Sequence, residues 1–319
     1  MKFFQKSIFW LIVLVFLGGT FTLLDHRAEE NKRLDAVQRQ LFPFAQEQIT
    51  AFWIENRVQA GRIRLVRSGE EWRVVEPVQT RGDAKAVQKF LANTLKGQRD
   101  AVLFASPTPE QRQELGVDLP EVSLGFEVGG RTEVVRFGKR GPTNNVAYAQ
   151  FDGDARIYRL HSDIKEEANK GVYLLRDKTV LPLDPTHMVK MELNRRDKPR
   201  VVIRQREGRW EMTEPVVARA SMTRVLESLF AIKNAEIKAF FDQSPPAAAQ
   251  HGLETPAIQL TVTEQEREER LYSLLIGAKD RSQRGYFAKR GDEAALFLLD
   301  EETVHALMVE PAHWQEGSE

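Results

Sequence analysis

Two stretches of the chain decide its fold: Trp72-Arg73-Val74-Val75-Glu76-Pro77-Val78 and Trp210-Glu211-Met212-Thr213-Glu214-Pro215-Val216. They lie 138 residues apart, and in both a tryptophan is followed four residues later by Glu-Pro-Val. Each stretch is preceded by a run of alternating apolar and polar residues and by a turn that contains Gly69 or Gly208. A strand, a glycine turn and a second strand together indicate a β-hairpin. The sequence therefore predicts the same hairpin twice.

The match continues beyond the hairpins. A helix is expected after each, with Asp83 or Ser221 as its N-cap, because short polar side chains satisfy the free N–H groups of a first turn. The offset stays between 136 and 139 as further pairs follow, which are Leu115-Gly116-Val117-Asp118-Leu119-Pro120 with His251-Gly252-Leu253-Glu254-Thr255-Pro256, and Phe137-Gly138 with Ile276-Gly277. We interpret this order as an internal duplication.

The two copies are predicted to span residues 47–183 and 184–319. Short strands joined by turns are typical of antiparallel sheets. The expected fold class is therefore α+β: an N-terminal transmembrane helix followed by two tandem copies of a mostly antiparallel sheet with packed helices.

An apolar segment near the N-terminus predicts the membrane helix. Residues 8–24 read IFWLIVLVFLGGTFTLL and contain no charge. As a helix they would span about 26 Å, enough for the hydrocarbon core of a bilayer. A cleavable signal peptide is the alternative, but its small-x-small cleavage site should follow the apolar stretch. The nearest match, Gly18-Gly19-Thr20, lies inside it. We therefore predict an uncleaved anchor in residues 1–25 that binds the bilayer through residues 8–24.

The charges around this segment do not decide its orientation. Lys2 and Lys6 precede it, and charges of both signs follow it, whereas the positive-inside rule needs an asymmetry of basic residues. A short basic leader before a long domain usually stays in the cytoplasm, so we expect the bulk of the chain to be exported. Residues 26–46 predict a juxtamembrane helical stalk that ends near Pro43. A solvated spacer is favoured over a coiled-coil seam, which needs three or four heptads.

The composition excludes several classes of protein. Lysine plus arginine (46) equal aspartate plus glutamate (46), whereas a nucleic-acid-binding protein usually carries a basic excess. The chain has no cysteine. Disulfides, thiolate metal sites, cysteine nucleophiles and a lipidated cysteine are therefore excluded. We predict no nucleic-acid partner.

No motif in the chain predicts a catalytic, cofactor-binding or metal site. The histidines (His26, His161, His187, His251, His305 and His313) show no metal-ligand spacing such as His-Glu-x-x-His. A Gly-x-Ser-x-Gly elbow does not occur, and neither does the penicillin-binding type of set, in which Ser-x-x-Lys is accompanied by Ser-Asp-Asn and Lys-Thr-Gly. A hydrolytic triad can still assemble from distant residues. No cofactor is expected.

Three features remain as alternatives to a purely structural interpretation. The loop Gly138-Lys139-Arg140-Gly141 resembles an anion-binding loop, but it lacks the P-loop pattern and has a matching turn at Gly277, so hairpin geometry is favoured. Trp72 and Trp210 could line a groove, although a repeated tryptophan is more typical of a core. Glu76 and Glu214 could form a catalytic pair only if the copies face each other.

The chain resembles the bacterial domain-of-unknown-function family 4340. The resemblance rests on the N-terminal apolar helix, the hairpin with Trp-x-x-x-x-Pro, the Gly-Leu-x-x-Pro-like elements at 116–120 and 252–256, and Arg176-Asp177-Lys178. Gly116-Val117 departs from the Gly-Leu that the family favours. Members often occur beside components of gliding-motility-type ABC transporters, so the resemblance implies an accessory role at the bacterial inner membrane, with the bulk of the chain in the periplasm.

These observations favour a membrane-anchored envelope protein that acts as a non-catalytic scaffold or ligand-presenting accessory subunit of an ABC-type transport complex. Its expected partner is an integral-membrane transporter. One alternative is an envelope hydrolase with a site between the two repeats, and another is a structural tether in cell-envelope assembly. Because Pro182-Leu183-Asp184-Pro185 is a short connection, we expect the working surface in a cleft between the copies.

Overall fold

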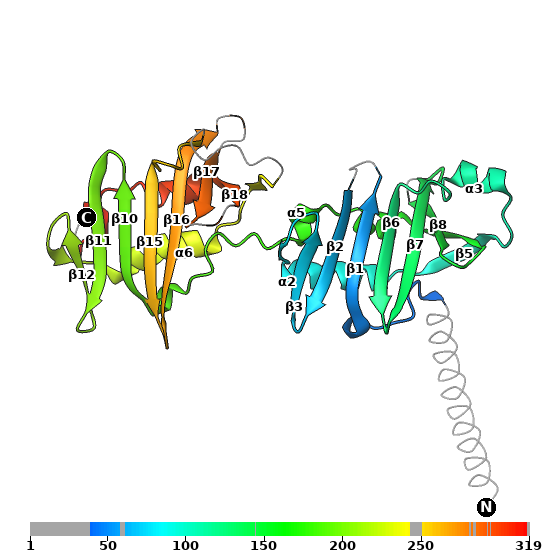
Figure 1. Cartoon of the computed structure of the whole chain (residues 1–319), viewed down its shortest axis with the longest axis horizontal. Coiled ribbons are helices and arrows are strands. Elements are labelled where there is room, and N and C mark those ends of the chain that lie inside the picture. The colour runs from blue at the N-terminus through cyan, green and yellow to red at the C-terminus, as the bar shows by residue number, and fades with distance from the viewer. Residues whose placement is uncertain are drawn as a thin grey trace, which may run out of the picture. The chain divides into compact units, whose positions relative to one another are not determined.

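The computed structural model of the chain (Figure 1) describes residues 39–57, 61–143, 145–242, 251–280, 282, 285–291, 293 and 295–317. The predicted anchor at residues 8–24 and most of the predicted stalk lie outside these ranges. Among the described residues, no helix combines the length and the apolar character that a membrane span requires.

The chain divides into two compact units, residues 1–176 and 177–319, called here the first and the second unit. The division falls before the predicted boundary at 183/184. The reason is that Val180, Leu181 and Leu183 are buried in the core of the second unit. Residues predicted as the end of the stalk also belong to a folded unit, because Leu41 and Phe42 are buried in the core of the first.

The first unit holds, within the described residues, a nine-stranded antiparallel sheet with the strand order β4-β3-β2-β1-β6-β7-β8-β9-β5. Its strands are β1 (Ile49–Asn56), β2 (Gly61–Ser68), β3 (Glu71–Glu76), β4 (Thr80–Arg81), β5 (Arg99–Phe104), β6 (Val122–Val128), β7 (Arg131–Arg140), β8 (Val146–Phe151) and β9 (Ile157–His161). Its helices are η1 (Gln46–Gln48), α2 (Ala84–Leu95), α3 (Pro109–Leu115), α4 (Ser162–Ala168) and α5 (Val172–Leu175).

The second unit repeats this architecture, with the order β13-β12-β11-β10-β15-β16-β17-β18-β14 in its described part. Its strands are β10 (Met188–Arg195), β11 (Lys198–Arg206), β12 (Arg209–Glu214), β13 (Ala218–Arg219), β14 (Ala239–Phe240), β15 (Ile258–Gln265), β16 (Glu269–Asp280), β17 (Gly285–Arg290) and β18 (Leu296–Asp300). Its helices are η2 (Pro185–His187), α6 (Met222–Asn234), α7 (Glu301–His305) and η4 (Pro311–Trp314).

The shared strand order confirms the predicted duplication. Every strand of the second sheet takes the place of the strand numbered nine lower in the first. Single hydrogen bonds are repeated as well: Gly82 N donates to Trp72 O (2.8 Å), and Ala220 N donates to Trp210 O (2.9 Å). The expected mostly antiparallel sheets with packed helices are therefore present twice.

The repeated hairpin owes its turn to glycine and its stability to tryptophan. Gly69 joins β2 to β3 with φ +65°, and Gly208 joins β11 to β12 with φ +76°. Residues that have a Cβ rarely adopt this backbone conformation. Trp72 and Trp210 are 7% and 8% exposed and lie in the hydrophobic cores. Both tryptophans are therefore core residues, as predicted.

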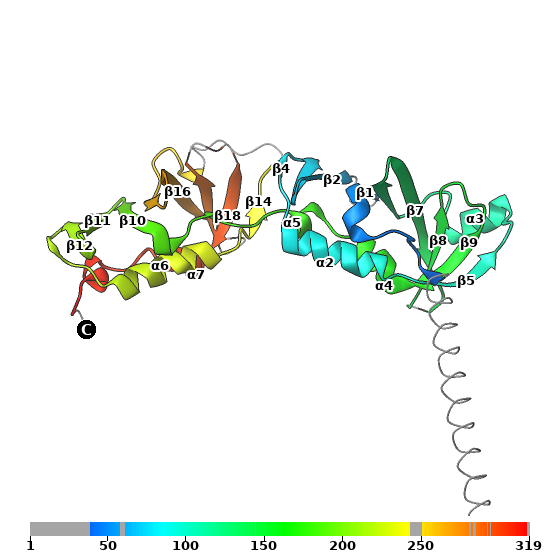
Figure 2. The same cartoon turned by 90° about the horizontal axis from the view of Figure 1, so that it is seen from below.

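The longest helix of each unit lies on one face of its own sheet. Figure 2 shows α2 and α4 along one face of the first sheet, and α6 and α7 along one face of the second. The buried residues of α2 are Val87, Phe90, Leu91 and Thr94, and those of α6 are Val225, Ser228, Leu229 and Ile232. Side chains alternate along a strand, so the other residues of β1, β2 and β6 face away from these helices.

The two long helices begin at the predicted residues but are capped differently. The Asp83 carboxylate accepts a hydrogen bond from Ala86 N (3.0 Å), whereas the Ser221 side chain makes no capping bond. We expect Asp83→Ala to lower the free energy of unfolding by about 1 kcal/mol, as for other caps. Ser221→Ala should change it by less than about 0.5 kcal/mol. Denaturant unfolding of the full chain measures both, and equal losses would contradict the difference in capping.

Candidate functional site

Each unit carries the same ion pair at the matched position of its sheet. Arg62 Nε lies 3.8 Å from Glu76 Oε2, and Arg200 Nε lies 3.8 Å from Glu214 Oε2. All four side chains are about half exposed. The two glutamates that precede the repeated prolines are therefore each neutralised by an arginine of their own unit.

In the first unit this arginine also stacks on a tryptophan. Trp53 on β1 lies directly opposite Gly125 on β6. Its indole rests on that glycine, since a Cβ at residue 125 would lie 2.2 Å from Trp53 Cε2. The guanidinium carbon of Arg62 is 4.6 Å from the centroid of the indole ring, which is a cation–π distance. Trp53 and Glu76 thus hold Arg62 from two sides.

The second unit replaces this stacking with ion pairs. Glu192 on β10 takes the position of Trp53, and Thr261 on β15, directly opposite, takes that of Gly125. The Glu192 carboxylate pairs with Lys190 and Arg200. Both hydrogen bonds lower the pKa of Glu192, and the bond to Lys190 has the larger effect. Arg200 thus matches Arg62, but the side chains around it differ from those of the first unit.

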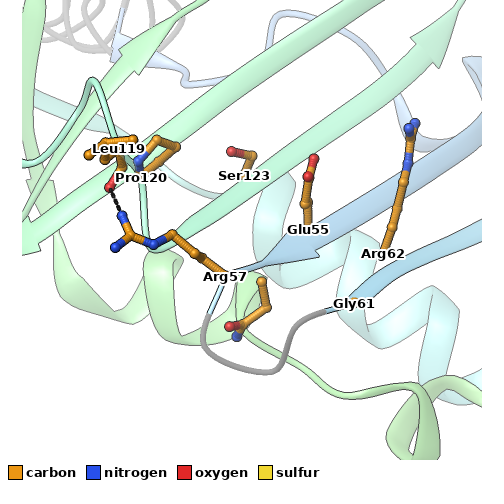
Figure 3. Close-up of a pocket in the computed structure, with 8 residues that line it drawn as sticks. Glu55, Arg57, Gly61, Arg62, Leu119, Pro120 and Ser123 are labelled. Carbon is orange, nitrogen blue, oxygen red and sulfur yellow. Dashed lines mark hydrogen bonds between the residues drawn. The ribbon is translucent and has the colours of Figure 1, made fainter.

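A pocket of about 550 Å³ opens at the end of β1 in the first unit. Figure 3 shows Glu55, Arg62 and Ser123 projecting to the same side of the sheet, with the Leu119–Pro120 loop across from them. Its lining residues are Glu55, Asn56, Arg57, Gly61, Arg62, Leu119, Pro120 and Ser123.

The charged groups of the pocket are held apart. Glu55 lies directly opposite Arg62 on β2 and Ser123 on β6. Its carboxylate nevertheless forms no hydrogen bond or ion pair with another described residue. Arg57 turns away from it and donates to the Leu119 carbonyl oxygen (3.5 Å). The pocket therefore offers one exposed carboxylate between two guanidinium groups.

Part of this arrangement belongs to the repeated frame. Arg57 N donates to Glu121 O and Arg196 N to Ala257 O, both at 3.0 Å. The Arg196 guanidinium donates to the Thr255 carbonyl oxygen, as Arg57 does to that of Leu119. These two arginines therefore brace the same strand and loop in each unit, which is a structural role.

Three other pocket residues, Glu55, Ser123 and Leu119, have different counterparts in the second unit. The pair Glu55 and Ser123 corresponds to Asn194 and Gln259 in the second. At the loop, Leu119 corresponds to Thr255. The carboxylate and the apolar wall are thus found on one copy of the frame only, and we take this pocket as the candidate site.

The family model described as Domain of unknown function (DUF4340) matches residues 72–246 and 210–318. The chain belongs to this family. The two matches begin at Trp72 and Trp210, so the DUF4340 pattern itself starts at the repeated motif. Neither curated proteins nor solved structures gave a match.

In this DUF4340 protein the glycine loop considered from the sequence is the end of strand β7, with Gly141 directly after it. A Cβ at Gly138 would lie 2.2 Å from the Leu115 carbonyl oxygen, and one at Gly277 would lie 2.1 Å from that of His251. Arg140 forms an ion pair with Glu166 (2.8 Å). The repeated glycine therefore allows two backbone segments to touch, which favours the structural interpretation.

The histidines do not gather at this pocket. His161 Nδ1 lies 3.1 Å from Asp163 Oδ2, and the His251 ring packs on Phe287 with centroids 3.8 Å apart. In the part of the chain that the structure describes, histidine, aspartate and glutamate form no group of three or more that could hold a metal ion. His26 lies outside the described residues.

Sequence reasoning missed the pocket residues Glu55, Arg57, Arg62 and Ser123, and also Trp53. The duplication is visible in the sequence only from residue 63 onward, where the two copies have similar residues at matched positions. Strands β1 and β10 become equivalent only through their pairing with β6 and β15. The signal that identifies the site, the difference between Trp53 and Glu192, becomes visible only once this register is known.

Proposed function

We propose that this DUF4340 protein is a membrane-anchored, non-catalytic subunit of an ABC-type transport complex that presents a ligand on its first unit. The observation that carries the proposal is the pocket around Glu55. It lies on one copy of a duplicated sheet, and within the described residues its carboxylate has no hydrogen-bond or ion-pair partner, whereas the matched carboxylates Glu76 and Glu214 are paired. A surface that differs between two units of the same fold is typical of a surface that binds a specific ligand.

The proposal also includes a location. Residues 8–24 form the anchor in the bacterial inner membrane, and the bulk of the chain lies in the periplasm. The support is the uncharged run of that segment and its length relative to a bilayer. The transporter partner follows from the family resemblance of the sequence.

Co-purification tests this role. A full-length chain with a C-terminal tag is extracted from membranes in mild detergent, and the proteins recovered with it are identified by mass spectrometry. We expect a multi-spanning subunit of an ABC transporter in near-stoichiometric amount. A tagged single-pass membrane protein expressed at the same level is the control for unspecific recovery. Recovery of envelope-assembly proteins without a transporter subunit would replace the proposal with the tether.

A further inference from the structure

We propose that the pocket at the end of β1 binds a small zwitterion of about dipeptide size, which carries an ammonium and a carboxylate group. This assignment deepens the ligand-presenting role proposed above. It rests on the separation of charge within the pocket, on its apolar wall and on the residues that only the first unit possesses.

The separation of charge is built into the sheet. Residues directly opposite on antiparallel strands have Cβ atoms about 4.5–5.5 Å apart, so Glu55 and Arg62 could pair directly. They do not, because the guanidinium of Arg62 stacks on Trp53 and approaches Glu76. Trp53 therefore keeps the Glu55 carboxylate out of an ion pair with Arg62, and a ligand with both charges can bridge the two groups.

The positions of the groups suggest how the ligand lies. Its ammonium would bind the Glu55 carboxylate, next to the hydroxyl of Ser123 across the strand pair. Its carboxylate would bind the guanidinium groups of Arg57 or Arg62, since arginine matches carboxylate geometry. Its apolar part would contact Leu119, which is 68% exposed. A pocket of about 550 Å³ is within the range of small-ligand sites.

The second unit offers an internal comparison. It keeps the two arginines, Arg196 and Arg200, but Asn194 stands in the place of Glu55. Arg200 is taken up by Glu192 and Glu214. Because the carboxylate is missing there and Arg200 is held by two carboxylates instead of one, we expect one binding site per chain.

Calorimetric titration of the purified full-length chain in detergent, without any partner, tests the ligand class. The probe is the dipeptide glycyl-leucine, compared with N-acetyl-glycyl-leucine, which lacks the cation, and glycyl-leucinamide, which lacks the anion. We expect the free dipeptide to bind at one site. Either modified probe should bind about ten- to a hundredfold more weakly, because each loses a charge-assisted hydrogen bond.

The variants assign the binding to this pocket. Glu55→Gln should weaken binding of glycyl-leucine by at least about tenfold, and Glu55→Asp should restore part of it. Glu133→Gln is the matched control, because Glu133 is an exposed carboxylate on β7 outside the pocket. Equal binding of free and acetylated dipeptide, or unchanged binding by Glu55→Gln, overturns the assignment. Absence of binding to all three probes overturns it too, while the co-purification result is independent of each outcome.

Discussion

Replacing Trp72 or Trp210 with alanine is expected to lower the free energy of unfolding by about 3–5 kcal/mol, as for other buried aromatic residues. Both are under a tenth exposed. The Trp72 ring packs against Phe52 with centroids 5.4 Å apart, so its removal leaves a cavity beneath the hairpin. Denaturant unfolding of the full chain measures the loss. Hydrogen exchange resolved by peptide shows which unit opens, which should be the unit that carries the substitution.

Trp53→Ala is the matched control for these two variants. Trp53 is only partly buried, and because its neighbour Phe52 stacks on Phe90 of α2, Trp53 faces away from that helix. Its loss should therefore cost clearly less than that of Trp72. It should instead release Arg62 toward Glu55 and weaken ligand binding. The opposite pattern would be unchanged stability in Trp72→Ala or Trp210→Ala together with lost binding. That result would mean that the repeated tryptophans bind the ligand and do not stabilise the two cores.

The parts of the fold that were predictable are those with strong local causes. A glycine with positive φ is required at Gly69 and Gly208, and a tryptophan four residues before Glu-Pro fills the core in both units. Each of these features requires a particular residue type, so the same residues occur at matched positions of both copies. The sequence therefore reveals the hairpins, the following helices and the duplication itself.

Other parts depend on contacts between distant residues and leave no local pattern. Leu41 and Phe42 follow a polar segment, yet both are buried, and Phe42 packs on Phe126 with ring centroids 4.9 Å apart. The edge strands β4 and β13 have only two residues each, too few for a visible period. A strand this short forms because its neighbour in the sheet is already in place.

The candidate site is of this second kind. Nothing in the run Ile49–Asn56 marks Glu55 as different from other surface glutamates. Its meaning comes from what lies opposite, Arg62 on one side and Ser123 on the other, and from the tryptophan that draws the arginine away. A binding site formed by the absence of an ion pair can be recognised only when the register of the sheet is known.

The glycine at residue 138 and its counterpart at residue 277 should be among the least replaceable positions of the chain. We expect Gly138→Ala and Gly277→Ala each to lower the free energy of unfolding by about 3 kcal/mol, the upper end of the range for overpacking. The added Cβ would lie 2.2 Å from Leu115 O or 2.1 Å from His251 O. Because the atom that must move is backbone, a side-chain rotation cannot relieve the contact. Denaturant unfolding of the full chain measures the loss.

Gly125→Ala separates a collision with backbone from one with a side chain. Its Cβ would meet the Trp53 indole at 2.2 Å, but this indole lies on the exposed face and can turn outward. We therefore expect a smaller loss of stability, accompanied by weaker ligand binding at the neighbouring pocket. If Gly138→Ala instead kept its stability and the chain lost affinity for inorganic phosphate, the close approach to α3 would not explain the glycine. The anion-binding interpretation of Gly138-Lys139-Arg140-Gly141 would then be the correct one.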